Sequence, residues 1–169
     1  MDPMQPLPAH FDLSETWRQR FMRLAIEVGS WSKDPASKVG AVLVDRRKRV
    51  TGLGFNGFPR NVPDHPELLE DRDAKLMRTV HAEVNAILNA TADVDGCALF
   101  ATLHPCLDCA KFIVQCGIGK VYHLEALPGR HSRWMENFES ARTVFREGGV
   151  LLEEVPRALV DVPRGPVQP

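Results

Sequence analysis

Two features that would each point to a large partner are missing from this sequence: a long apolar run and a surplus of one charge. No apolar run approaches the roughly 20 residues that span a bilayer, and the opening MDPMQPLPAHFD lacks the basic-then-apolar order of a leader peptide. The 21 lysines and arginines nearly cancel the 22 aspartates and glutamates, so no broad basic surface exists to grip a nucleic-acid polymer. We therefore expect a soluble, cytoplasmic protein that acts on a small molecule, without a membrane or nucleic-acid partner.

Cysteine is absent from most of the chain, and all four copies fall between residues 97 and 116. In a cytoplasmic protein such a cluster favours metal binding or burial over disulfides. Cys97 begins a predicted strand and Cys116 ends the apolar face of a predicted helix, so we expect both to be core thiols. The close pair Cys106 and Cys109 is the candidate for chemistry.

Repeats and low-complexity blocks are also absent, and 169 residues with 44% hydrophobic content suit one domain. Prolines gather at both ends of the chain. We predict an N-terminal arm over residues 1–12, a folded domain over 13–155 and a proline-rich C-terminal tail over 156–169.

The spacing of apolar residues predicts alternating helices and strands around a polar stretch at residues 64–80. Helical periodicity appears in four segments, at residues 14–31, 81–90, 105–117 and 133–149. Short apolar runs predict five strands, at residues 39–45, 49–56, 97–103, 121–126 and 150–155. This order predicts an α/β fold in which one sheet carries helices on both faces.

A candidate metal site combines the cysteine pair with a histidine. Cys106 and Cys109 lie at a predicted helix start, where both sulfurs can face one ion and the helix N-terminus favours thiolates. The CxxC pair alone leaves zinc, redox chemistry and chance open, but His81 begins another helix and supplies a third ligand. Two thiolates and one imidazole suit tetrahedral zinc, and three protein ligands leave a position for water, as in catalytic sites.

Glu83 follows His81 closely and is the candidate for moving protons. Taken alone, the pair is more typical of helix capping, since acidic side chains are common in first turns. Residues two apart in a helix also point to opposite sides, unless His81 lies at the cap, where the backbone is not helical. With the cysteines, the open fourth position gives Glu83 a water to deprotonate.

HAE at residues 81–83 and PCLDC at 105–109 match the H-x-E and P-C-x-x-C signature of zinc-dependent nucleobase deaminases. Over roughly residues 14–154 the chain resembles deoxycytidylate deaminases in particular. The segments that carry this resemblance are SKDPASKVGAVLV (32–44), GFNGFPRNV (54–62), HAEVNAIL (81–88) and LHPCLDCAKFIVQCGI (103–118).

The resemblance implies a three-layer α/β/α sandwich with a mixed five-stranded sheet and one catalytic Zn²⁺ per chain. It also implies a homo-oligomer, either a hexamer or a dimer. Regulation by dCTP and dTTP, with Mg²⁺ accompanying such an effector, is implied in the same way.

The implied reaction is hydrolysis of dCMP to dUMP and ammonia, which supplies dUMP for dTTP synthesis. Glu83 takes the water's proton and delivers protons to ring N3 and the departing amine. Asn56 matches the asparagine with which the family contacts the sugar and the base. The other substrate contacts that the resemblance implies are Ala82 and, for the phosphate, Ser32, Lys33, Lys38 and Arg60.

The sequence departs from the family in three places. The usual GYNG is GFNG here, which removes a hydroxyl. The segment 125–137 lacks the family's tyrosine, for which Trp134 or His131 is the candidate substitute. Residues 57–80, where some members hold a second zinc, contain His65 but no cysteine, so we expect no structural zinc there.

Two alternative functions stay open. One is another zinc deaminase, acting on 5-substituted dCMP, dCTP, cytidine or tRNA adenosine. The other is a non-catalytic zinc-binding module, against which Glu83 and the missing fourth protein ligand both argue. Two further residues have open roles, because His104 and Asn85 are each expected either to border the pocket or to serve locally.

Overall fold

A computed structural model of the chain describes residues 12–127 and 135–160. Its centre is a five-stranded sheet in the order β2-β1-β3-β4-β5. The strands are β1 (Gly40–Val44), β2 (Val50–Phe55), β3 (Ala98–Ala101), β4 (Lys120–Leu124) and β5 (Leu151–Val155). β1 is antiparallel to both β2 and β3, whereas β3, β4 and β5 are parallel, so the sheet is mixed.

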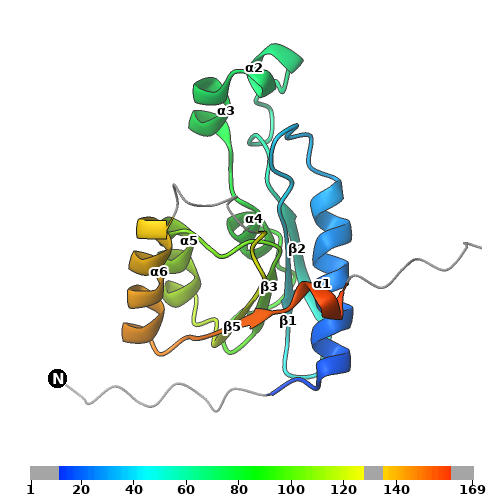
Figure 1. Ribbon diagram of the computed structural model, residues 1–169, viewed down its shortest axis with the longest axis vertical. Helices are drawn as coiled ribbons and strands as arrows, with labels where there is room; N and C mark the ends of the chain where they lie inside the picture. Colours follow the sequence, from blue (N-terminus) through cyan, green and yellow to red (C-terminus); the bar gives the residue numbers. More distant parts are fainter. Residues whose placement is uncertain (1–11, 128–134, 161–169) are drawn as a thin grey trace, which may run out of the picture.

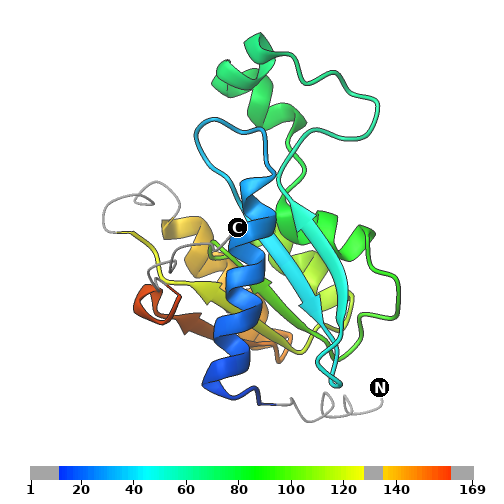
Figure 2. The same cartoon turned by 90° about the vertical axis from the view of Figure 1, so that its right-hand side faces the viewer.

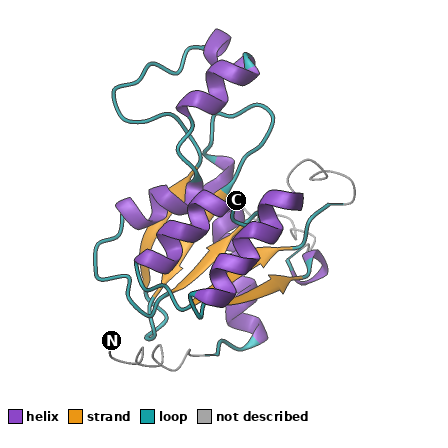
Figure 3. Cartoon of the chain, turned by 90° about the vertical axis from the view of Figure 1, so that its left-hand side faces the viewer, coloured by secondary structure: helices purple, strands orange, loops and turns teal. Residues whose placement is uncertain are grey.

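Helices cover both faces of this sheet (Figure 1). α1 (Glu15–Ser30) lies on one face, as Figure 2 shows. α4 (Ala82–Leu88), α5 (Leu107–Gln115) and α6 (Met135–Glu147) lie on the other face, which is turned toward the viewer in Figure 3. The predicted three-layer α/β/α sandwich is confirmed, and the predicted helices and strands all form, with ends shifted by a few residues.

The period-2 geometry of the strands divides the core into two halves. In β1, Ala41 and Leu43 face the α4–α5–α6 layer, while Val42 and Val44 face α1. All five residues of β1 are buried, because the strand lies inside the sheet with helices above and below it. A strand that is buried on both faces typically has a continuous apolar sequence, as VGAVLVD does.

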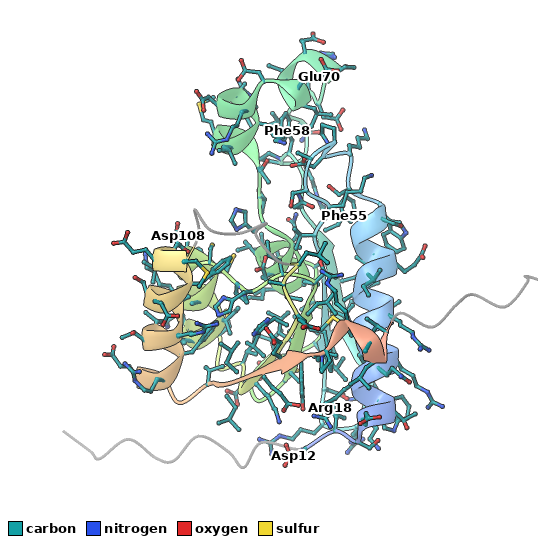
Figure 4. The ribbon with its side chains drawn as sticks, viewed as in Figure 1. Asp12, Arg18, Phe55, Phe58, Glu70 and Asp108 are labelled. Carbon is teal, nitrogen blue, oxygen red and sulfur yellow. The ribbon has the colours of Figure 1, made fainter. Side chains whose placement is uncertain are left out.

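The segment from Gly57 to Val80, which we call the overhang, is more structured than the polar connection that the sequence predicts. It contains two short helices, α2 (Pro66–Glu70) and α3 (Arg72–Arg78), which pack mainly against each other beyond the end of the sheet (Figure 1). Figure 4 shows Phe58 and Glu70 there, above Phe55 at the end of β2. A backbone bridge between Gly57 and Val80 closes the base of the overhang.

The C-terminal part of the chain adds contacts beyond the predicted domain boundary. A short 3₁₀ helix, η2 (Arg157–Leu159), follows β5, and Val160 is buried in the α1 half of the core. Gln19 of α1 donates a hydrogen bond to the Leu159 carbonyl. No helix among the described residues is both long and apolar enough to cross a membrane.

Candidate active site

The N-termini of two helices lie next to each other. His81 is the N-cap of α4 and Cys106 is the N-cap of α5, and both have extended backbone angles. Because His81 stands outside the helical turns, its side chain is free to turn toward Cys106, while Glu83 projects from the first turn of α4. Together with Cys109 on α5, these residues form what we call the metal corner.

Close packing fixes the position of α4. The helix lies on β1 and β2, and a Cβ added to Gly54 of β2 would stand 2.2 Å from the Ala82 carbonyl oxygen and 2.3 Å from the Ala86 nitrogen. Only glycine permits so close an approach of strand and helix. Gly54 thereby lets the turn of α4 that carries Glu83 lie close against β2.

Three ligand atoms converge at the metal corner. Nδ1 of His81 lies 3.3 Å from the sulfur of Cys106 and 3.3 Å from that of Cys109, and all three ligand atoms lie within 4.8 Å of one another. In a tetrahedral zinc site with ordinary bond lengths, sulfur and nitrogen ligands are separated by about 3.5 Å. The donor set therefore fits zinc in both chemistry and spacing.

The short distances between these three side chains also shift their pKa values. A hydrogen bond from Cys109 lowers the pKa of the Cys106 thiol to about 4, against the effect of burial, and His81 adds to the lowering. The hydrogen bond with Cys106 raises the pKa of His81 to about 9. The interaction with Cys106, together with burial, raises the pKa of Cys109. A metal ion that binds here displaces protons, so its affinity rises with pH.

Glu83 is buried, with 4% of its surface exposed. Burial raises the pKa of its carboxyl, although the neighbouring His81 acts in the opposite direction. A carboxyl whose pKa is raised toward neutrality can both accept and return a proton. Glu83 thus has the burial and the neighbours expected of a proton carrier.

The metal corner opens into a pocket of about 380 Å³, within the usual size range for a small-molecule site. Its walls come from the loop before β1, the end of β2, the overhang, the metal corner and α6. The lining residues are Asp34, Ala36, Ser37, Val39, Asn56, Glu70, Arg72, Lys75, Leu76, Thr79, His81, Ala82, Glu83, Leu103, His104, Cys106 and Phe138.

Asn56 lies in this wall, with its side-chain amide held by the preceding loop. Its Oδ1 accepts from the Val39 backbone N–H at 2.8 Å, and its Nδ2 donates to the Ser37 carbonyl at 2.9 Å. Ser32 is not part of the lining. It is buried, and its hydroxyl donates to the Asn56 carbonyl at 2.8 Å, so it supports the residue that lines the pocket.

The three cations predicted for the phosphate lie outside the lining of this pocket. Lys33 pairs with Asp64 at 2.6 Å. Lys38 donates to the backbone carbonyl of Ser32, and Arg60 donates to Oδ1 of Asn89 at 3.2 Å. Each cationic group is directed to a partner on the surface or on the backbone.

A buried ion pair in the pocket wall has no counterpart among the sequence predictions. Lys75 of α3 donates to Oδ1 of Asp34 at 2.8 Å, and both residues are more than nine-tenths buried. Asp34 also accepts from the backbone N–H groups of Ala36 and Ser37. Because the partners are far apart in sequence, no local pattern could have paired them.

His104 borders the pocket and also makes a local hydrogen bond, so both expected roles hold. Its Nδ1 lies 2.8 Å from the Pro105 carbonyl, which can only accept, so Nδ1 carries the proton. Its ring packs on Phe138 and His123. Burial lowers the pKa of His104 to about 4, which makes it neutral near pH 7.

The remaining predictions for single residues have mixed outcomes, and some fall on residues that are not described. Cys97 is buried, whereas Cys116 is half-buried. Asn85 donates to the Phe55 carbonyl at 2.8 Å, a local role between α4 and β2. Trp134 and His131 lie outside the described residues.

Comparisons with known proteins point to one family. The family described as "cytidine and deoxycytidylate deaminase zinc-binding region" matches residues 15–125. A protein of Aliivibrio fischeri described as an uncharacterized deaminase is 42% identical over 83% of this chain and 94% of its own length. The deoxycytidylate deaminase of Mus musculus is 38% identical over 79% of this chain and 76% of its own.

Solved structures share the fold. The dCMP deaminase of cyanophage S-TIM5 in complex with dCMP and dUMP is 26% identical, with a TM-score of 0.70, and covers 85% of this chain and 100% of that one. A structure from a study of tRNA:A34 deaminases is 27% identical, with a TM-score of 0.52 over 82% of this chain and 98% of that one.

Proposed function

This chain belongs to the cytidine and deoxycytidylate deaminase family, and we propose that it hydrolyses dCMP to dUMP and ammonia. The observation that carries the proposal is a buried glutamate beside a His-Cys-Cys donor set, with Glu83, His81 and Cys106 lining a nucleotide-sized pocket. Relatives named deoxycytidylate deaminase, and a dCMP deaminase bound to dCMP and dUMP, support dCMP as the substrate.

In this proposal His81, Cys106 and Cys109 hold the zinc ion, and among the described residues no further His, Cys, Asp or Glu joins that group. When bound, zinc supplies a Lewis acid that lowers the pKa of water toward neutrality. A set of three protein ligands is the arrangement of catalytic sites, and a structural site adds a fourth.

Glu83 moves the protons. Its carboxylate takes a proton from the attacking water and passes protons to ring N3 and to the amine at C4, which leaves as ammonia. The burial that raises its pKa makes the protonated state accessible midway through the reaction. Asn56 and Ala82 border the space next to Glu83 and are the proposed contacts for the sugar and the base.

The test is ammonia release from dCMP, CMP, dCTP, deoxycytidine and 5-substituted dCMP, with and without a chelator. We expect dCMP to be the preferred substrate, and we expect activity to disappear on chelation and to return with zinc. A tRNA anticodon stem-loop containing adenosine belongs in the same panel, because a tRNA:A34 deaminase study contributes one of the similar folds. Preference for that RNA would replace dCMP, and no release from any substrate would leave only a zinc-binding module.

Several finer points are part of the proposal. We propose a homo-oligomer, hexamer or dimer, because Leu88 of α4 and Phe112 of α5 expose 73% and 53% of their surfaces. Regulation by dCTP and dTTP, with Mg²⁺ bound alongside the effector, rests on the family resemblance, and the cytoplasmic location remains an expectation from the sequence pattern. Light scattering tests the oligomeric state, and activity assays with each effector present test the regulation.

A further inference from the structure

The pocket that contains the metal corner has few cationic side chains. Among the described residues that line it, the lysines and arginines are Arg72 and Lys75, both on α3. They lie three positions apart, so they share one face of that short helix. The cations of the 32–38 loop and Arg60 lie outside the lining.

Lys75 is already committed to another partner. Its ammonium is 2.8 Å from the Asp34 carboxylate, and only 11% of its side chain is exposed. A charge that is neutralised in this way contributes little net attraction to an incoming anion. The ion pair instead ties α3 to the loop that carries Ser37, whose carbonyl holds Asn56.

The charge of Arg72 is still available. Its side chain is 63% exposed, and its guanidinium lies 3.6 Å from the carboxylate of the adjacent Asp73, whose side chain is 94% exposed. An ion pair so open to water neutralises little of the charge. A guanidinium also offers paired N–H donors that match a phosphate, which a single ammonium cannot do.

We propose that Arg72 binds the phosphate of the nucleotide substrate, and that the Lys75–Asp34 pair holds Arg72 at the pocket. Arg72 is a specificity residue, since it distinguishes the nucleotide from the nucleoside, and Lys75 is a positioning residue. Glu70 lines the same pocket and has the opposite charge, so it weakens the attraction for phosphate. The inference rests on the proposed deamination of a nucleotide.

The test compares dCMP with deoxycytidine in wild-type enzyme and in Arg72→Gln. A lost charge-assisted contact should raise KM for dCMP by about 10- to 100-fold. The kcat for dCMP should stay close to wild type, because the phosphate is held equally in the ground and transition states. Deoxycytidine turnover should not change, which shows that the metal corner is intact.

Further variants separate this role from a structural one. Arg78→Gln makes the same charge change on the same helix, at a side chain that does not line the pocket and that donates to the Ala74 carbonyl, so it should leave the ratio of dCMP to deoxycytidine turnover unchanged. Arg72→Lys should keep part of the dCMP preference, and Glu70→Gln should lower KM for dCMP by about 2- to 5-fold.

Two results would overturn the inference while leaving the proposed function in place. One is an unchanged preference for dCMP in Arg72→Gln. The other is a loss of that preference in Lys33→Gln or Arg60→Gln, which would show that the cations predicted from the family resemblance bind the phosphate. If wild-type enzyme releases no ammonia from dCMP, the proposed function itself fails.

Discussion

The metal corner and the overhang border one pocket, but they are held in place in different ways. The metal corner rests on two helices packed against the sheet, and its glutamate and both cysteines are buried. In the overhang, residues 57–80, the only buried side chain is Lys75, and its partner is Asp34 rather than an apolar core. The reacting groups are thus fixed by core packing, and the proposed phosphate contact depends on one ion pair.

The largest effect should come from Glu83→Gln. The amide keeps the shape of the side chain but cannot shuttle a proton, so kcat should fall by about 10²- to 10⁴-fold or more. The fall should be equal for dCMP and deoxycytidine, because the metal corner acts on the base and not on the phosphate. Zinc content, measured by atomic emission, should match wild type, and a variant that binds zinc and remains active would refute the proposed role.

The next largest effect should come from Gly54→Ala, which tests whether close packing of α4 on β2 positions the metal corner. Gly54→Ala places a methyl group 2.2 Å from the Ala82 carbonyl, so α4 must shift. We expect a loss of about 3 kcal/mol in the free energy of unfolding, with weaker zinc binding and a lower kcat on every substrate. Urea denaturation and zinc titration measure these changes.

Gly57→Ala is the matched control for that substitution. An added Cβ there meets its nearest atom, in the Phe55 ring, at an ordinary 3.9 Å. Stability and zinc affinity should therefore stay close to wild type. If both alanines behaved alike, the close approach of β2 and α4 would not be what positions Glu83.

Asp34→Asn tests the attachment of the overhang. The amide keeps an acceptor for the backbone N–H groups of Ala36 and Ser37 but leaves the Lys75 ammonium without a counter-charge. We expect a loss of about 2 kcal/mol, below the cost at a fully enclosed pair, because the pair borders the pocket. Hydrogen exchange should rise in α3, because the helix loses its anchor to the loop before β1.

Asp64→Asn provides the control, because it breaks the exposed pair with Lys33, whose side chain is 69% accessible. Water screens such an exposed pair, so its loss should change the free energy of unfolding very little. An equal loss in Asp34→Asn and Asp64→Asn would show that burial of the first pair does not anchor α3.

The same contrast explains which features the sequence could predict. β1 is recognisable from a continuous apolar run, and His81, Glu83, Cys106 and Cys109 stand in two short motifs whose spacing is set by metal chemistry. Here local pattern and tertiary structure agree.

The overhang could not be predicted in that way. α2 and α3 contain five and seven residues, too few to show an amphipathic period. Their signals are limited to Pro66 at a helix start and Asp71, whose carboxylate caps the Ala74 N–H. The pairing of Lys75 with Asp34 depends on the fold, so an isolated lysine in a polar stretch carries no indication of it.

The smallest effect should be a difference in acid sensitivity between the two regions. Burial lowers the pKa of His104, beside the metal corner, to about 4, so the folded state favours its neutral form. The unfolded state binds a proton near pH 6.5, and this contribution is therefore complete above pH 6.5 and is lost as the pH falls toward 4.

Asp34 should behave differently. Burial alone would raise its pKa, but the hydrogen bonds from Lys75, Ser37 and Ala36 bring the pKa below its ordinary value. Its contribution is therefore complete above about pH 4 and is lost only at lower pH. Between pH 7 and 5 the overhang should keep its anchor while the surroundings of His104 lose stability.

Urea unfolding of wild type, His104→Asn and Asp34→Asn from pH 7 to 5 measures the difference. In the wild type, the free energy of unfolding should be about 1 kcal/mol lower at pH 6 than at neutral pH, because the unfolded state gains a proton on His104 and the folded state does not. This part of the pH dependence should vanish in His104→Asn, whose amide can still donate to the Pro105 carbonyl. Asp34→Asn should be less stable throughout but have the wild-type slope, because Asp34 does not titrate in this range. Parallel slopes in all three proteins would contradict the assignment of the acid-sensitive step to His104, since the pH dependence would then come from groups that these variants share, such as the zinc ligands.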